Sequence, residues 1–325
     1  MEDKTKKDID FDIKKNEIQS LIEQDKFEEV IEKLEDNEID FETLSKEDKG
    51  EAYYSLGKIL SHDKKNSDYE KSIIDDYQIE KDLKKAVICY WHALNYDNTN
   101  TPRKLFSIYM SDDYGFKDED MAFKICVYGI NIKDPKSYFN LGKLYYHGFY
   151  RKEGYEFYYV QDRNEAKKLF EESVQINPRW GGYELGCMYE HGECGCPTNY
   201  KKAFNYYRDA ADYGDKLAMF KVACIYGTKD EKQNFQNVQF NKDLSIKYFE
   251  NHLKQVKSDK RSHSITSIGV LKYENAESQK EKIDGIKNII RGAKKGNDWA
   301  QRYLKNNNIG SVDEPEKFDL SFMEK

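Results

Sequence analysis

The stretch LGKLYYHG at residues 141–148 returns as LGCMYEHG at residues 185–192. Both copies fit the pattern Leu-Gly-x-x-Tyr-x-x-Gly, and a weaker copy, LGKILSHD, lies at residues 56–63. In a helix, the Leu, Gly and Tyr of this pattern lie on one side. The first Gly lets another helix backbone approach closely, although it lowers helix propensity by about 1 kcal/mol relative to Ala. The final Gly is typical of a helix C-cap, so the pattern predicts a helix that packs closely against a neighbour and then ends.

A second motif follows the first. Its clearest copy is KAFNYYRDAA at residues 202–211, and residues 85–94 (KAVICYWHAL) and 165–174 (EAKKLFEESV) match it. It places Ala and an aromatic ring four residues apart, a small-then-large pair that fits against the Gly of the first motif. Each repeat is therefore predicted to be a helix, a loop and an antiparallel helix. Because one such pair cannot bury its own apolar face, we expect successive pairs to stack into an all-α, right-handed α-solenoid.

The two motifs together resemble the Sel1-like repeat, a branch of the tetratricopeptide-like superfamily. Residues 181–217 match its pattern closely, residues 137–178 match it well, and the rest of 50–305 matches loosely. The resemblance implies that the first helices line a concave groove and that the motif residues are packing residues. It also implies an adaptor or scaffold rather than an enzyme.

The predicted organisation follows the register of the repeats. We expect N-terminal capping helices at residues 1–49, about six helix pairs at 50–292, a closing helix at 293–310 and a flexible tail at 311–325. Near the N-terminus, an apolar stripe of Ile18, Leu21 and Ile22, continued by Phe27, Val30, Ile31 and Leu34, predicts two amphipathic helices.

Three repeats carry extra residues in the same loop. The family pattern implies sixteen residues between the motif Gly and the motif Ala. The spacing is twenty-nine from Gly57 to Ala86, twenty-four from Gly142 to Ala166 and twenty-two from Ala223 to Ser245. Insertions that gather on one face of a solenoid often form its binding face. The first insertion, residues 61–82, is acidic and polar and is predicted to be a flexible loop.

The insertion of the third repeat is rich in aromatic residues. Tyr155, Phe157 and Tyr159 alternate with other residues at strand spacing, and Gly154 can turn the chain. A small β-hairpin is therefore predicted near residues 149–160. Two interpretations of the rings stay open: they fold back and fill a gap between neighbouring loops, or they form an aromatic contact patch, since Tyr is enriched at interface hot spots.

We predict that the chain is a non-catalytic scaffold or adaptor that binds a protein or peptide through the groove and the inserted loops. The candidate contact residues are Tyr54, Lys58, Lys143, Tyr146, Tyr150, Tyr155, Phe157, Tyr159, Cys187 and Met188. The sequence contains no phosphate-binding loop, dinucleotide-binding Gly pattern, His-Glu-x-x-His or Gly-x-Ser-x-Gly motif. No catalytic residue and no cofactor is therefore predicted.

The alternative is a zinc-binding or enzyme-associated module centred on Cys187, His191, Cys194 and Cys196. Three thiolates and an imidazole suit tetrahedral Zn²⁺. Two points favour ordinary thiols instead. His191 occupies the slot that His147 fills in the preceding repeat, where no cysteines follow, and Cys194-Gly-Cys196 is not the usual ligand spacing.

Charge and hydropathy exclude two classes of partner. A net charge of −7 argues against nucleic-acid binding, which needs clustered Lys and Arg. No apolar run reaches the ~18 residues of a membrane helix, so no membrane insertion is predicted. Because the first residues lack the apolar region of a signal peptide, we expect a cytoplasmic protein whose six cysteines stay reduced.

Overall fold

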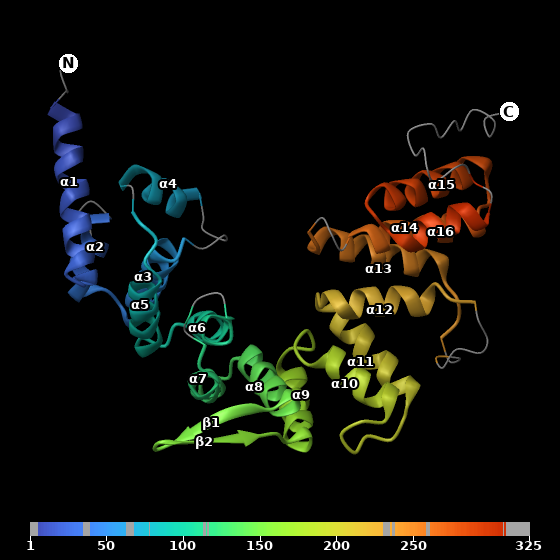
Figure 1. The fold of residues 1–325 in the computed structure, drawn as a ribbon, viewed down its shortest axis with the longest axis horizontal. Coiled ribbons are helices and arrows are strands. Elements are labelled where there is room, and N and C mark those ends of the chain that lie inside the picture. Colours follow the sequence, from blue (N-terminus) through green and yellow to red (C-terminus); the bar gives the residue numbers. More distant parts are fainter. Residues whose placement is uncertain are drawn as a thin grey trace. The chain divides into compact units, whose positions relative to one another are not determined.

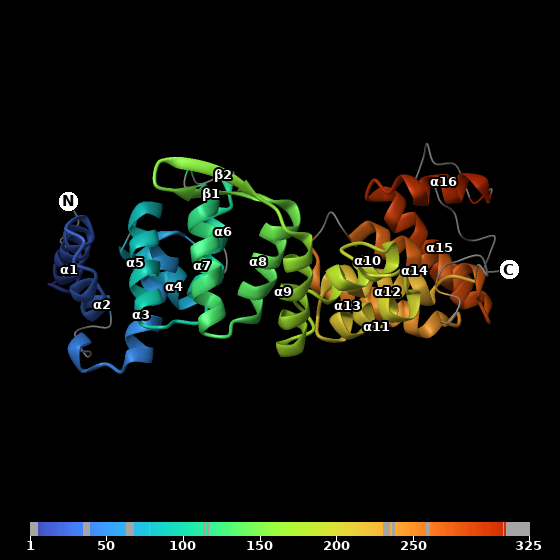
Figure 2. The same ribbon diagram turned by 90° about the horizontal axis from the view of Figure 1, so that it is seen from below.

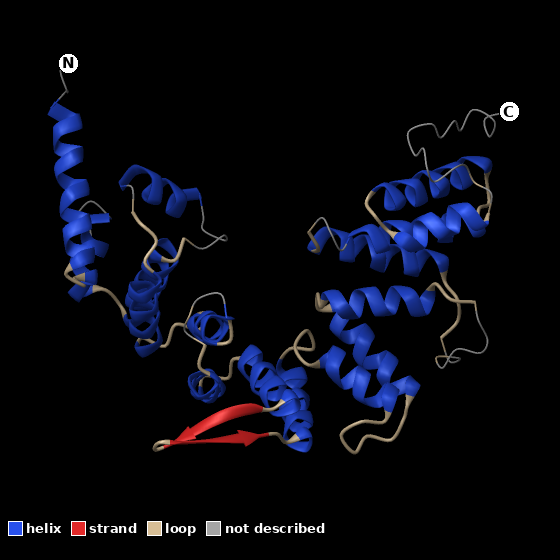
Figure 3. Cartoon of the chain, in the orientation of Figure 1, coloured by secondary structure: helices blue, strands red, loops and turns tan. Residues whose placement is uncertain are grey.

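The computed structural model describes residues 6–34, 40–62, 68–77, 79–112, 115, 117–229, 235, 238–257, 261–307 and 309 (Figure 1). These residues form sixteen α-helices, one short 3-10 helix and one antiparallel pair of strands (Figure 3). The predictions of an all-α chain and of a hairpin near residues 149–160 are confirmed. The chain divides into two compact units, which comprise residues 1–162 and residues 163–325.

The first unit begins with the two predicted helices and ends with the hairpin. Its elements are α1 (Lys6–Glu23), α2 (Phe27–Leu34), the 3-10 helix η1 (Phe41–Thr43), α3 (Lys46–Leu60), α4 (Asp68–Tyr77), α5 (Leu83–Asn95), α6 (Thr101–Tyr109), α7 (Glu119–Asn131), α8 (Pro135–His147), β1 (Phe149–Glu153) and β2 (Glu156–Val160). Ile18 on α1 and Val30 on α2 are fully buried, so the apolar stripe of the sequence is the inner face of this end of the unit.

The Gly of the first motif meets the ring of the second, as the pattern predicts. A Cβ added to Gly57 on α3 would lie 2.7 Å from Cε1 of Tyr90 on α5, and Tyr90 is completely buried. Its hydroxyl lies 3.1 Å from Oγ of Ser61, so the buried polar atom has a partner. The helices α3 and α5 therefore form one repeat, packed through a glycine and a ring.

The insertion at residues 61–82 is not simply a flexible loop. Its residues 68–77 form the helix α4, and Ile73 and Ile79 are 6% and 4% exposed. Nζ of Lys58 on α3 also lies 2.6 Å from a carboxylate oxygen of Glu70, which is buried on α4. The polar composition does not indicate a helix, because only a few residues of α4 face the core. Residues 63–67 and 78 lie outside the described part of the chain.

The second unit contains the best-matching repeat. Its elements are α9 (Arg163–Ile176), α10 (Gly182–His191), α11 (Tyr200–Asp212), α12 (Lys216–Tyr226), α13 (Lys242–Gln255), α14 (Arg261–Glu274), α15 (Gln279–Lys294) and α16 (Asp298–Asn306). Within it, α10 packs on α11, α12 on α13 and α14 on α15. A Cβ added to Gly186 on α10 would lie 2.4 Å from Cε1 of the fully buried Tyr207 on α11, which repeats the packing of Gly57 and Tyr90.

Short polar side chains start the second helices of the repeats. The side chain of Asp82 accepts a hydrogen bond from the backbone N–H of Lys85 at 3.0 Å, and that of Asn199 accepts one from Lys202 at 2.9 Å. Asn241 does the same for Leu244 at the start of α13. These bonds satisfy backbone donors that have no partner inside the helix.

The last helix closes the second unit. Ala300 and Leu304 of α16 are buried against Ile286, Ile289 and Ile290 of α15. The predicted tail at residues 311–325 lies outside the described residues. Among the helices that the structure describes, none is long and apolar enough to cross a membrane.

Candidate protein-interaction site

The hairpin holds four of the ten predicted contact residues. β1 and β2 pair antiparallel from Phe149 opposite Val160 to Glu153 opposite Glu156, without a bulge. The strands are joined by the two-residue turn Gly154–Tyr155, in which Gly154 has φ +62°. Gly adopts that backbone conformation at little cost, so the predicted turning point is confirmed.

One face of the hairpin packs on α7. Directly opposite residues share a face, so Phe149, Arg151 and Tyr158 point to the same side. Phe149 is 1% exposed, and its ring stacks on that of Phe123 on α7 at a centroid distance of 5.5 Å. The guanidinium of Arg151 lies 3.7 Å above the same ring. Figure 2 shows the strands crossing over one end of this helix.

A buried carboxylate fixes the hairpin to the start of α7. Asp120 is 6% exposed and accepts from Nε of Arg151 at 2.6 Å, while Nζ of Lys124 lies 2.7 Å from its other oxygen. The backbone N–H of Lys152 donates to it at 3.3 Å. Burial alone would raise the pKa of Asp120, but the bonds from Lys124, Arg151 and Lys152 prevail and lower it to about 2. The carboxylate is therefore charged and anchors β1.

The opposite face of the hairpin carries exposed rings. Tyr150, Phe157 and Tyr159 are 56%, 67% and 54% exposed, and Tyr155 at the turn is completely exposed. The rings of Tyr150 and Tyr159 contact each other edge to face at 5.4 Å. The rings therefore do not fill a gap between loops, as one interpretation of the sequence proposed. Phe149, by contrast, is buried against Phe123 on α7 and Tyr145 on α8.

Tyr159 also helps to hold the base of the hairpin. Its hydroxyl donates to the backbone oxygen of His147 at 2.9 Å. Gly148, at φ +86°, lies directly under the Tyr159 ring, because a Cβ there would be 1.8 Å from the hydroxyl oxygen. Tyr159 is thus both an exposed ring and a structural contact. The Phe157 ring contacts only the neighbouring strand among the described residues, where Nζ of Lys152 lies 5.7 Å from its centroid.

The four candidates on helices of the first unit differ in their surroundings. Tyr54 is half-buried with its ring 5.7 Å from that of Tyr90, and Lys58 is engaged by Glu70. Lys143 is exposed, and its Nζ lies 5.7 Å above the Phe139 ring. Tyr146 is half-buried, with its ring against that of His147.

The two candidates on α10 are largely packing residues. Met188 is 2% exposed, so its prediction as a surface contact is wrong: it lies on the side of α10 that faces the core. Cys187 is half-buried, and its Sγ lies 3.3 Å from the hydroxyl oxygen of Tyr207. A helix of ten residues with a wide apolar face leaves few positions exposed, and the sequence pattern alone does not show which positions these are.

The zinc alternative finds no support in the described residues. No group of three or more His, Cys, Asp or Glu side chains among them is placed to hold a metal ion. Nδ1 of His191 lies 2.9 Å from the backbone oxygen of Cys187, and Cys196 is 4% exposed. Burial raises the pKa of the Cys187 and Cys194 thiols, which disfavours the thiolate form that binds metal.

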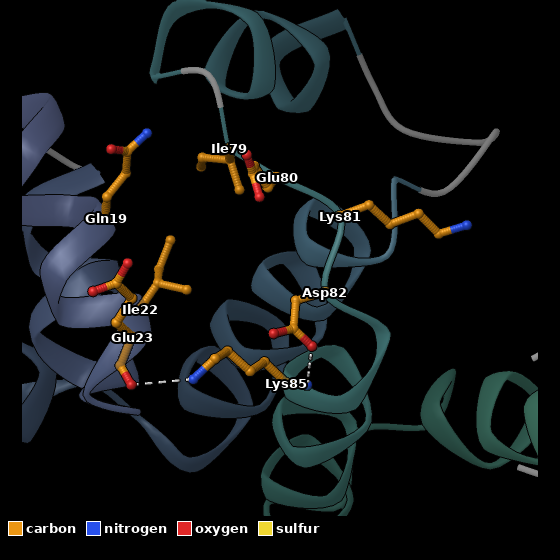
Figure 4. A pocket seen from close by; sticks show the side chains of 8 residues that line it. All are labelled: Gln19, Ile22, Glu23, Ile79, Glu80, Lys81, Asp82 and Lys85. Carbon is orange, nitrogen blue, oxygen red and sulfur yellow. Dashed lines mark hydrogen bonds between the residues drawn. The ribbon is translucent and has the colours of Figure 1, made fainter. Parts of the chain in front are cut away.

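A polar pocket lies between α1 and the segment that precedes α5 (Figure 4). Its volume is about 300 Å³, and its wall combines Glu23 and Glu80 with Lys81 and Lys85. Nζ of Lys85 donates to the backbone oxygen of Glu23 at 3.3 Å and is paired with Asp25. The sequence pattern does not predict this pocket, and its mixture of charges selects no class of ligand.

Comparison with known proteins supports the fold. No protein-family model matches the sequence, and no curated protein matches it. Among solved structures, nineteen chains match. One is c5321, a protective antigen present in uropathogenic Escherichia coli strains displaying an SLR fold; it is 18% identical, the match covers 79% of this chain and 56% of c5321, and the TM-score is 0.51. The chain thus spans little more than half the length of c5321.

A second match is a Sel1 repeat protein from Oxalobacter formigenes, which is 20% identical. This match covers 72% of the present chain and 91% of that protein, with a TM-score of 0.49. The similarity to c5321 agrees with the glycine–ring packing that recurs at Gly57 and Gly186. The chain has the fold of a Sel1-like repeat protein.

Proposed function

We propose that the chain is a non-catalytic scaffold that binds a protein or peptide through the outer face of the hairpin, defined by Tyr150, Tyr155, Phe157 and Tyr159. The observation that carries the proposal is that these rings are more than half exposed on a strand pair that is itself firmly attached. Large rings bury much area when a partner covers them, about 150–250 Å² each. Lys143 and Tyr54 are secondary candidates on helices.

The attachment of the hairpin favours binding. Phe149 and Arg151 pack on α7, and Asp120 holds the backbone of β1. The strands are therefore ordered before a partner arrives, so the entropy lost on association is smaller than for a free loop. Tyr also brings contact area with few rotatable bonds, which is why it is common at binding hot spots.

The location of the protein is part of the same proposal. All six cysteines are free thiols, and Cys89 and Cys126 are buried in helices. Free thiols suit a reducing compartment, so we infer a cytoplasmic scaffold.

The test uses a photo-crosslinking amino acid in place of Tyr155 in the full chain, in extracts of the source cells. We expect crosslinks to a small set of proteins, and their loss when Phe157→Ser is added. The matched control is Tyr213→Ser at the C-terminal end of α11 in the second unit. Tyr213 is 60% exposed and lies outside the hairpin.

Unchanged crosslinking in Phe157→Ser would contradict the proposal, as would equal losses in Tyr213→Ser. Melting curves of both variants should match the unsubstituted chain, because neither ring is buried.

A further inference from the structure

The outer edge of β2 is an unpaired strand edge. The backbone N–H groups of Tyr150 and Lys152 point away from β2, since they donate to Oε2 of Glu119 at 2.7 Å and to Oδ1 of Asp120 at 3.3 Å. Backbone groups alternate between the two sides of a strand. The partners of these residues across the hairpin, Tyr159 and Phe157, therefore point their N–H and C=O groups away from β1.

The two edges of the hairpin differ in whether their backbone groups have hydrogen-bond partners. The edge of β1 is closed by the carboxylates of α7, whereas β2 lies on the side away from α7 (Figure 1). Among the described residues, no group bonds to the outward backbone of Phe157 or Tyr159. Natural edge strands usually carry a Lys, a Pro or a bulge that prevents pairing. β2, with the sequence EFYYV, has no Lys, no Pro and no bulge, and its one charged residue, Glu156, is the first of the strand.

We propose that β2 pairs antiparallel with β2 of a second copy of the chain, about a two-fold axis at Tyr158, and so forms a four-stranded sheet. In this register Phe157 lies opposite Tyr159 of the other copy, and the two residues exchange both backbone hydrogen bonds. The two-fold axis gives the same pair of bonds between Tyr159 and Phe157 of the other copy, so the sheet gains four backbone hydrogen bonds. Each outward backbone group of β2 is then satisfied.

The side chains fit a second copy. Each Phe157 ring comes to lie beside a Tyr159 ring on the outer face, and aromatic cross-strand pairs stabilise sheets. The charge of β2 is compatible too: its single charged residue, Glu156, falls opposite Val160 of the other copy, so no like charges meet directly. A two-fold interface uses the same patch twice, and this edge is complementary to itself.

The dimer would join the outer faces of two hairpins into one surface of rings. This inference goes beyond the proposed function and does not depend on it, since the edge is a backbone feature and the scaffold needs only exposed rings. One short edge buries little area, so we expect a weak dimer of the kind formed by interfaces below ~1,200 Å².

Sedimentation velocity of the full chain from about 5 to 500 µM provides the first test, as weak interfaces dissociate in the micromolar range. We expect the unsubstituted chain to dimerise as its concentration rises. Phe157→Pro removes an outward N–H that β1 does not use, and should raise the dissociation constant at least ~10-fold. Phe157→Ser keeps that N–H and loses only the ring, so it should weaken the dimer less.

A crosslink gives a second test that needs no proline. The axis places the two Tyr158 side chains opposite each other in a non-hydrogen-bonded pair, where Cβ atoms approach closely enough for a disulfide. Tyr158→Cys should therefore form a disulfide dimer under mild oxidation much faster than Tyr155→Cys, although residue 155 is the more exposed.

The inference is overturned if the unsubstituted chain stays monomeric at the highest concentration, or if Tyr155→Cys crosslinks as fast as Tyr158→Cys. It is also overturned if an added extended peptide binds to the monomer and this binding is lost in Phe157→Pro, because the edge would then pair with a strand of another molecule. If no partner protein is crosslinked at residue 155, or if the crosslinks are unchanged in Phe157→Ser, while the chain still dimerises, the proposed function alone is contradicted.

Discussion

At the scale of single residues, helix pairing depends on glycines that lie under large rings. The ring of Tyr90 covers Gly57, and the ring of Tyr207 covers Gly186; both tyrosines are completely buried. The Tyr207 hydroxyl donates to a carboxylate oxygen of Glu190 at 2.6 Å, which is in turn paired with Lys221 at 2.9 Å. Burial and the bonds to Cys187 and Glu190 raise the pKa of Tyr207, so the phenol stays protonated.

Gly186→Ala should destabilise the chain by about 1–3 kcal/mol, because the new methyl group overlaps the Tyr207 ring in a filled core. The gain in helix propensity, about 1 kcal/mol, offsets only part of this cost. Urea unfolding followed by circular dichroism measures the change. In a Tyr207→Leu background the added cost of Gly186→Ala should shrink, and equal costs in both backgrounds would show that the ring is not the cause.

His252 makes stability depend on pH. It is 6% exposed on α13, its Nδ1 lies 2.9 Å from Oγ of Ser264, and its ring contacts Phe220. Burial lowers the pKa of His252, and Lys216 lowers it further. The unfolded chain, with a His pKa of about 6.5, thus binds the proton more readily than the folded chain. This contribution to stability is therefore complete above that pH and is lost below it.

We therefore expect the urea midpoint to fall between about pH 7.5 and pH 5, and the fall to be smaller in His252→Gln. His263→Gln on α14 is the control, because His263 is exposed. A pH dependence that is the same in all three proteins would exclude His252 as its source.

At the scale of elements, the carboxylate of Asp120 helps to attach the hairpin to α7, together with the ring of Phe149 and the bond from Tyr150 to Glu119. Asp120→Asn should lower the free energy of unfolding by about 1.5–3 kcal/mol, the range for hydrogen bonds to charged groups, and should speed hydrogen exchange at the Lys152 amide. Since the pKa of Asp120 is lowered to about 2, the same contribution is present above about pH 4 and is lost as the pH falls toward 2.

Glu153→Gln removes the same charge at the exposed end of β1 and serves as the control for Asp120→Asn. Equal exchange rates in the two variants would show that Asp120 does not hold the hairpin.

The sequence predicts most elements but not all of their surroundings. Recurring Gly and ring residues predict the helix pairs because the contact lies within each repeat, and alternation over residues 155–159 predicts the strand for the same local reason. It does not predict α4, whose burial depends on Lys58 and on a core built by other helices. It also does not separate Phe149 from the exposed rings, since only the position of Phe123 on α7 decides which face is covered.

At the scale of the whole molecule, the chain consists of two compact units that meet in sequence at residues 162 and 163. Each repeat contacts mainly its neighbours, so the stability of such a protein is close to a sum of local terms. We expect residues 1–162 and residues 163–325, expressed separately, each to give a helical spectrum and a cooperative melting transition. A fragment that is unstructured alone would show that its fold requires the other half.

The turn at Gly154 and Tyr155 has a practical consequence. Within the described part of the chain, no atom would lie within 4 Å of a Cβ added to Gly154, and Tyr155 is fully exposed, so the tip makes no contact there with the helices. The paired strands below it bring the two ends of any grafted segment close together, which keeps the entropy of loop closure low. An affinity tag or a fluorescent label inserted there would not contact the helices, so the turn is a suitable insertion point for purification and imaging.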